Sequence, residues 1–182
     1  MNETVFYFLQ VASTLSVIPP LLVGTIQVIK RDFKIKLFIG FLFIGLVSDL
    51  LGWHFFLTKN GEANHYTRYL YDLVESVFLF WFISEVSPAK AIRLIFSRAW
   101  MLLIPFWSTI FIYPSNINIF ESTTYVFIAF GSGFCLLKMI EIQSTPSFLP
   151  IFWMLLGVFF YCFCTFFINS IFSINYCFVW PK

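Results

Sequence analysis

Long apolar runs separated by short polar turns dominate the sequence. The runs cover about residues 4–29, 37–57, 65–85, 100–113, 122–140 and 149–172. A helix needs about 20 mainly apolar residues to cross the hydrocarbon core of a bilayer. Inside lipid, helices and closed barrels are the folds that satisfy their own backbone hydrogen bonds. We therefore expect an all-α, polytopic transmembrane bundle of six helices that forms a single domain over residues 1–182.

The composition agrees with a membrane location. Hydrophobic residues make up 60% of the chain and charged residues 11%, whereas a soluble domain carries about 25% charged residues. A net charge of +2 is too small to indicate nucleic-acid binding. The four cysteines form no CxxC pair, so neither a disulfide framework nor a zinc site is indicated. The lipid bilayer is the expected partner, and no cofactor is expected.

The basic residues predict how the helices are oriented. Cytoplasmic loops of membrane proteins carry an excess of Lys and Arg. With the N-terminus outside, the inner segments hold Lys30, Arg31, Lys34, Lys36, Lys90, Arg93, Arg98 and Lys138, and the outer segments hold Lys59, Arg68 and Lys182. This imbalance favours an outer N-terminus, and six helices then return the C-terminus to the same side.

The third apolar run carries an unusual set of ionisable residues. His65, Arg68, Asp72 and Glu75 are spaced by three and four residues, which places them on one stripe of a helix. An ionised side chain near the middle of a membrane is unfavourable by several kcal/mol, so such groups usually pair inside a bundle or line a wet cavity. The stripe is therefore expected to face other helices.

The second run supplies further polar groups at a matching depth. Asp49 and His54 lie in its outer half, and a short turn joins it to the third run, so the two helices should be antiparallel neighbours. We predict an outward-facing polar pocket, with no assigned catalytic residue or metal ligand, built from Asp49, His54, His65, Arg68, Asp72 and Glu75.

A purely structural alternative remains open for the same residues. Arg68 can pair with Asp72 one turn along the helix, while protonated Glu75 and Asp49 hydrogen-bond Tyr69, Tyr71, Ser48 or Ser76.

Three segments carry a resemblance to a known group of proteins. SVIPPLLVGTIQVIK, GFLFIGLVSDLLGWHF and YLYDLVESVFLFWFIS resemble the first three helices of uncharacterised seven-helix integral membrane proteins of Bacteroidetes-type bacteria. The resemblance implies a multi-pass protein of the bacterial cytoplasmic (inner) membrane, associated with signalling. It also implies that this chain, with six helices, lacks the last one or that a membrane protein partner or a second copy completes it.

The sequence is compatible with three functions. The leading one is a non-enzymatic sensor or complex subunit, because no nucleophile, base and oxyanion donor are assembled. An intramembrane metal-dependent hydrolase is the first alternative, since Ser48-Asp49 resembles a motif of the seven-helix zinc hydrolases of the ceramidase and progestin-receptor type. Those enzymes take paired histidines from the last helix, and this chain has no His after His65. A small transporter or proton pathway is the second alternative.

Overall fold

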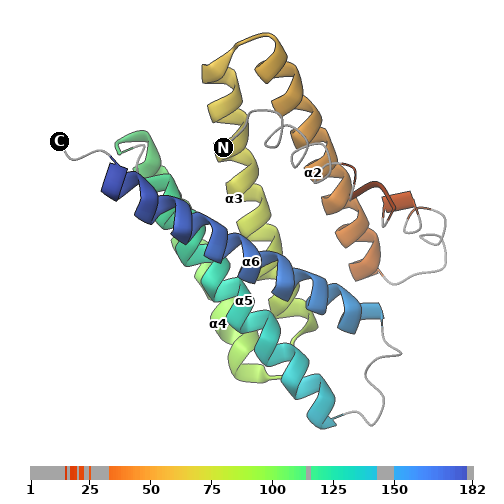
Figure 1. The fold of residues 1–182 in the computed structure, drawn as a ribbon. Coiled ribbons are helices and arrows are strands. Elements are labelled where there is room, and N and C mark those ends of the chain that lie inside the picture. The colour runs from red at the N-terminus through yellow and green to blue at the C-terminus, as the bar shows by residue number, and fades with distance from the viewer. Residues whose placement is uncertain are drawn as a thin grey trace. The chain divides into compact units, whose positions relative to one another are not determined.

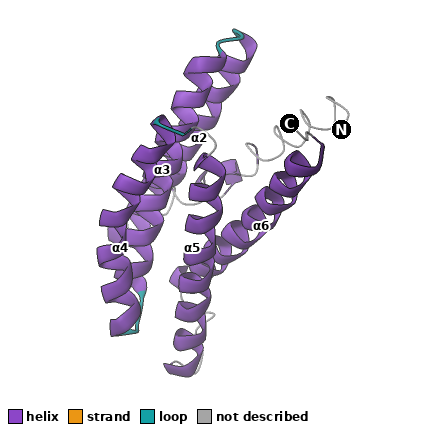
Figure 2. Cartoon of the chain, turned by 90° about the vertical axis from the view of Figure 1, so that its left-hand side faces the viewer, coloured by secondary structure: helices purple, strands orange, loops and turns teal. Residues whose placement is uncertain are grey.

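The computed structural model describes residues 15, 17–19, 21–22, 25, 33–113, 116–142 and 150–179, with side chains as far as 167 and at 170. Within these residues the chain forms helices and short turns and no strand (Figure 2). The expected all-α fold is confirmed. The first expected helix, over residues 4–29, lies outside the described residues apart from a few positions.

The described helices are longer than the apolar runs that predict them. They are α2 (Phe33–Leu57), α3 (Gly61–Val86), α4 (Lys90–Ser108), the 3-10 helix η2 (Thr109–Phe111), α5 (Asn116–Ile142) and α6 (Pro150–Val179) (Figure 1). Large differences lie at the start of α4, which was expected near residue 100, and at the start of α5, which was expected at residue 122. In both places the helix continues through polar residues that flank the apolar run.

Four of the described helices are long and apolar enough to cross a membrane: Phe33–Leu57, Lys90–Phe111, Ile117–Ile142 and Pro150–Phe167. Helix α3 is not among them, although it is 26 residues long. Its sequence carries Glu62, Arg68, Asp72, Glu75 and Glu85. Where those charged groups lie therefore determines whether α3 can also cross.

The chain divides into two compact units, residues 1–71 and 72–182, and the boundary falls inside α3. In the first unit, α2 and the start of α3 form a helical hairpin (Figure 1). The turn is a Schellman motif: the Asn60 amide donates to the Phe55 carbonyl and the Lys59 amide to that of Phe56. Asn60 also caps α3, because its side-chain oxygen accepts a hydrogen bond from the Ala63 amide at 3.2 Å.

Two glycines of α2 lie against the start of α3 inside this hairpin. A Cβ atom on Gly45 would lie 3.0 Å from the Tyr71 hydroxyl, and one on Gly52 would lie 3.5 Å from the Asn64 side-chain oxygen. The two contacts fix the antiparallel register of the helices. They place Asp49, midway between the glycines on the same stripe, level with Thr67 and Arg68.

The second unit packs the end of α3 with α4, α5 and α6 through aromatic rings. Phe80 of α3 lies 4.9 Å from Phe96 of α4, and Phe106 of α4 lies 5.4 Å from Phe120 of α5, between ring centroids. Gly131 lets α5 approach α4 closely, because a Cβ atom there would lie 2.2 Å from Phe96. Helices α5 and α6 run alongside each other for much of their length (Figure 1).

Candidate functional site

The buried polar residues of the second unit gather between the end of α3 and the first half of α5. Asp72 and Glu75 of α3 are 7% and 3% exposed, and Glu121 and Tyr125 of α5 are 4% and 6% exposed. The Tyr125 hydroxyl donates a hydrogen bond to the Glu75 Oε2 atom at 3.1 Å, across fifty residues of sequence. We call Asp72, Glu75, Glu121, Thr124 and Tyr125 the carboxyl cluster.

Helical spacing explains why these residues face one another. Asp72 and Glu75 belong to a buried stripe of α3 that continues through Ser76, Leu79 and Ile83. Glu121, Thr124 and Tyr125 occupy the corresponding buried stripe of α5, three and four residues apart. Each stripe also contains buried apolar residues, such as Leu79 of α3 and Ile128 of α5, so the polar residues have hydrophobic neighbours.

Two contacts define the register of α3 against α5. One is the Tyr125–Glu75 hydrogen bond. The other lies lower on both helices, where the buried side chains of Cys135 and Ser87 are near each other. The helices therefore run parallel with an almost constant offset, and the same offset brings Asp72 level with Glu121.

Helix α6 closes the cluster on another side. The Tyr161 ring stands edge-on to the Tyr125 ring at a centroid distance of 6.0 Å. The buried Cys162 lies within electrostatic range of Glu75, and Tyr125 lies within range of Asp72, Glu75, Glu121 and Tyr161. Among the described residues, the buried polar side chains include no Lys, Arg or His.

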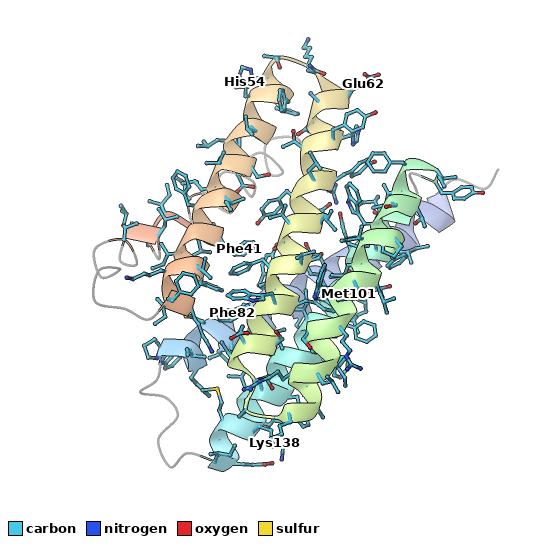
Figure 3. All side chains as sticks on the ribbon, turned by 180° about the vertical axis from the view of Figure 1, so that it is seen from behind. Phe41, His54, Glu62, Phe82, Met101 and Lys138 are labelled. Atoms are coloured by element: carbon cyan, nitrogen blue, oxygen red, sulfur yellow. The ribbon has the colours of Figure 1, made fainter. Side chains whose placement is uncertain are left out.

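The six residues predicted from the sequence fall into two groups. Asp72 and Glu75 are buried in the carboxyl cluster. His54, His65 and Arg68 are exposed, and Asp49 is half-buried in α2. His54 lies near the turn that joins α2 to α3, at the same end as Glu62 (Figure 3).

Asp49, His54, His65 and Arg68 belong to the first unit, whereas Asp72 and Glu75 belong to the second. The convergence of all six on one pocket therefore stays a prediction, as does the pairing of Arg68 with Asp72.

Sequence reasoning missed Glu121, Thr124 and Tyr125. The fifth helix was expected to begin at residue 122, which left Glu121 in a turn, whereas α5 begins at Asn116. A usable signal was present, since Glu121 and Tyr125 are four residues apart and Ile128 and Ser132 continue the same stripe.

The cluster offers carboxyl and hydroxyl oxygen atoms. Within the described part of the chain, no three His, Cys, Asp or Glu side chains are grouped so that they could hold a metal ion. Carboxyl and hydroxyl groups in apolar surroundings can bind and release a proton or hold a small cation. No known protein family, curated protein or solved structure matches this chain.

Proposed function

We propose that this chain is a multi-pass integral membrane protein of the bacterial inner membrane that acts as a non-enzymatic sensor or as a subunit of a membrane complex. Four described helices have the length and apolar character to cross a bilayer. We place α3 across the membrane as well, because Asp72 and Glu75 are buried against protein. The N-terminus is outside in this proposal, and six helices cross.

The observation that supports a sensing role is the hydrogen bond between Tyr125 and Glu75 within the carboxyl cluster. It links α3 to α5 through groups whose charge depends on their occupancy by a proton or cation. An uncompensated charge is unfavourable in an apolar interior, so a change in occupancy alters how tightly the two helices pack. The resemblance to membrane proteins associated with signalling agrees with this role.

Hydrogen exchange in lipid nanodiscs tests the proposal. Protection factors, which correct for the intrinsic effect of pH on exchange, are measured for the amides of α5 between about pH 5 and about pH 9. We expect protection to fall as pH rises, because carboxylate charge accumulates between α3 and α5. The titratable groups that face this site within residues 72–182 are Asp72, Glu75, Glu121, Tyr125, Tyr161 and Cys162.

Two variants of α3 make the test specific. Glu75→Gln keeps the shape of the side chain but removes its charge, and it should flatten the pH dependence. Glu85→Gln is the matched control, since Glu85 is exposed on the same helix, and it should behave as the wild type. An unchanged pH dependence in Glu75→Gln would refute a sensing role for the cluster.

Metal analysis of the purified protein separates the sensor from an intramembrane hydrolase. A metal-dependent hydrolase needs a bound ion to activate water. If the purified protein contained stoichiometric zinc and the Asp49→Asn or Asp72→Asn variant lost it, the hydrolase hypothesis would replace the sensor hypothesis.

A further inference from the structure

The Thr124 hydroxyl differs from two other helical hydroxyls of this unit. Ser132 donates to the Ile128 carbonyl at 2.7 Å, and Thr165 donates to the Tyr161 carbonyl at 2.8 Å. Thr124 is 2% exposed, yet its Oγ1 atom makes no hydrogen bond to any described residue. Buried hydroxyls normally have a partner, so this oxygen is available to a ligand.

The position of Thr124 on α5 places it in the carboxyl cluster. It follows Glu121 by one helical turn, and both residues belong to the buried stripe that faces α3. Phe120 and Gly131, on one flank of this stripe, contact α4, whereas Tyr125, on the other flank, contacts Glu75 and Tyr161. Thr124 and Glu121 therefore face the space between α4 and α3, and the register puts Glu75 level with Thr124.

We propose that Glu75, Glu121 and Thr124 bind one monovalent cation, which is a proton or Na⁺. This proposal rests on the proposed sensing role and names the ligand of the same site. Carboxylate and hydroxyl oxygens suit hard cations. A divalent ion is disfavoured, because no three acidic, His or Cys side chains converge among the described residues. A single positive charge offsets negative charge on the buried Glu75 and Glu121.

The groups that face this position come from three helices. Helix α3 contributes Asp72 and Glu75, α5 contributes Glu121 and Tyr125, and α6 contributes Tyr161 and Cys162. The buried side chains of α4 are the apolar Phe96 and Leu103. Tyr125 donates its hydrogen bond to one oxygen of Glu75, and it thereby positions that carboxyl group beside the cation.

Labelling with dicyclohexylcarbodiimide tests the proposal on the full chain in phosphatidylcholine nanodiscs. This apolar reagent modifies carboxyl groups within membranes when they are protonated, and peptide mass spectrometry locates the adduct. We expect modification of Glu75 that slows as pH rises. If Na⁺ also slows it relative to K⁺ at equal ionic strength, the cation is Na⁺. If Na⁺ and K⁺ act alike, it is the proton. Absence of labelling at Glu75, or labelling indifferent to pH and Na⁺, would overturn the proposal.

Two neighbouring threonines supply a matched pair of variants. Thr124→Val removes the buried hydroxyl and keeps the shape of the side chain, and it should weaken cation binding roughly tenfold, as expected for one lost ligand. The effect is measured as a shift in the Na⁺ concentration that halves the labelling rate, or in the pH at which the labelling rate is half of its maximum. Thr123→Val, next to it but exposed, should leave both unchanged, and Thr124→Ser should restore binding.

If Thr124→Val and Thr123→Val had the same effect on cation binding, Thr124 would not be part of the site. That failure is distinct from a failure of the sensing role. The sensing role is tested by the effect of Glu75→Gln on α5 protection, which does not depend on which cation binds.

Discussion

At the scale of single residues, the hydrogen bond from Tyr125 to Glu75 is the best-defined polar contact of the second unit. Both side chains are almost fully buried, so loss of either partner leaves the other group without its hydrogen bond in apolar surroundings. A buried polar group left unsatisfied destabilises a protein by about 1–3 kcal/mol. The two residues belong to different helices, so the loss should appear as weaker packing of α3 against α5.

We expect Tyr125→Phe to lower the free energy of unfolding by about 1–3 kcal/mol. The ring and its edge-on contact with Tyr161 are kept, so the change isolates the hydroxyl. Tyr113→Phe is the control, because Tyr113 is 62% exposed and should change stability little. Thermal unfolding in detergent, followed by circular dichroism, measures both. Equal stability of the two variants would mean that the Tyr125 hydroxyl contributes nothing.

At the scale of helices, glycines determine how closely neighbouring elements approach. Gly131 of α5 lies directly against the buried Phe96 ring of α4, whereas Gly157 of α6 has no described atom within 4 Å of the place where a Cβ would lie. Small residues at helix interfaces allow this kind of close contact in membrane proteins. The two positions therefore respond differently to the same added methyl group.

Gly131→Ala should destabilise the second unit by about 1–3 kcal/mol, because Phe96 is buried and has to move. Gly157→Ala should be neutral or stabilising by up to about 1 kcal/mol, since alanine is the better helix former and nothing obstructs it. Unfolding of both variants in detergent gives the comparison. A stabilising effect of Gly131→Ala would mean that α4 and α5 lie further apart than described.

The register of the α2–α3 hairpin predicts an interaction partner for Arg68. Its register places Asp49 level with Arg68, so we expect these two side chains to interact across the hairpin. In a double-mutant cycle, Asp49→Asn and Arg68→Gln should show a coupling of about 0.5 kcal/mol or more. Exposed ion pairs are weak, and Arg68 is exposed, so a large value is not expected. Coupling of Arg68 to Asp72 instead would support the pairing along α3 that the sequence also allows.

At the scale of the whole molecule, the proposed topology requires α3 to cross the membrane. Its length of 26 residues corresponds to about 39 Å at 1.5 Å per residue, which is enough to cross. Its two most deeply buried acids face α5 and not lipid. The basic residues Arg93, Arg98 and Lys138 lie at the start of α4 and the end of α5, and Lys138 marks that end of α5 in Figure 3.

Reporter fusions after Asn60, Pro88, Tyr113 and Ile142 test this topology. We expect outside, inside, outside and inside, because the basic ends of α4 and α5 then face the cytoplasm. The pair at Tyr113 and Ile142 is the control, since it flanks α5, which is apolar enough to cross. The same sidedness at Asn60 and Pro88 would show that α3 does not cross.

The sequence by itself determined that the chain is all-α and built from helices of membrane-crossing length. The length of an apolar run and its flanking turns are local properties, and a bilayer permits few folds. The sequence also singled out Asp72 and Glu75, because acidic residues in such a run need shielding wherever the run packs.

The tertiary structure alone decided which residues provide that shielding. Tyr125 lies fifty residues from Glu75 in the sequence, and Glu121 stood outside the expected fifth helix. The spacing within one helix fixes which residues share a face, but it does not fix the register of that face against another helix. The register of α3 and α5 follows instead from contacts such as Ser87 with Cys135, and the closeness of α4 follows from Phe96 against Gly131. Packing between distant segments therefore set the composition of the carboxyl cluster.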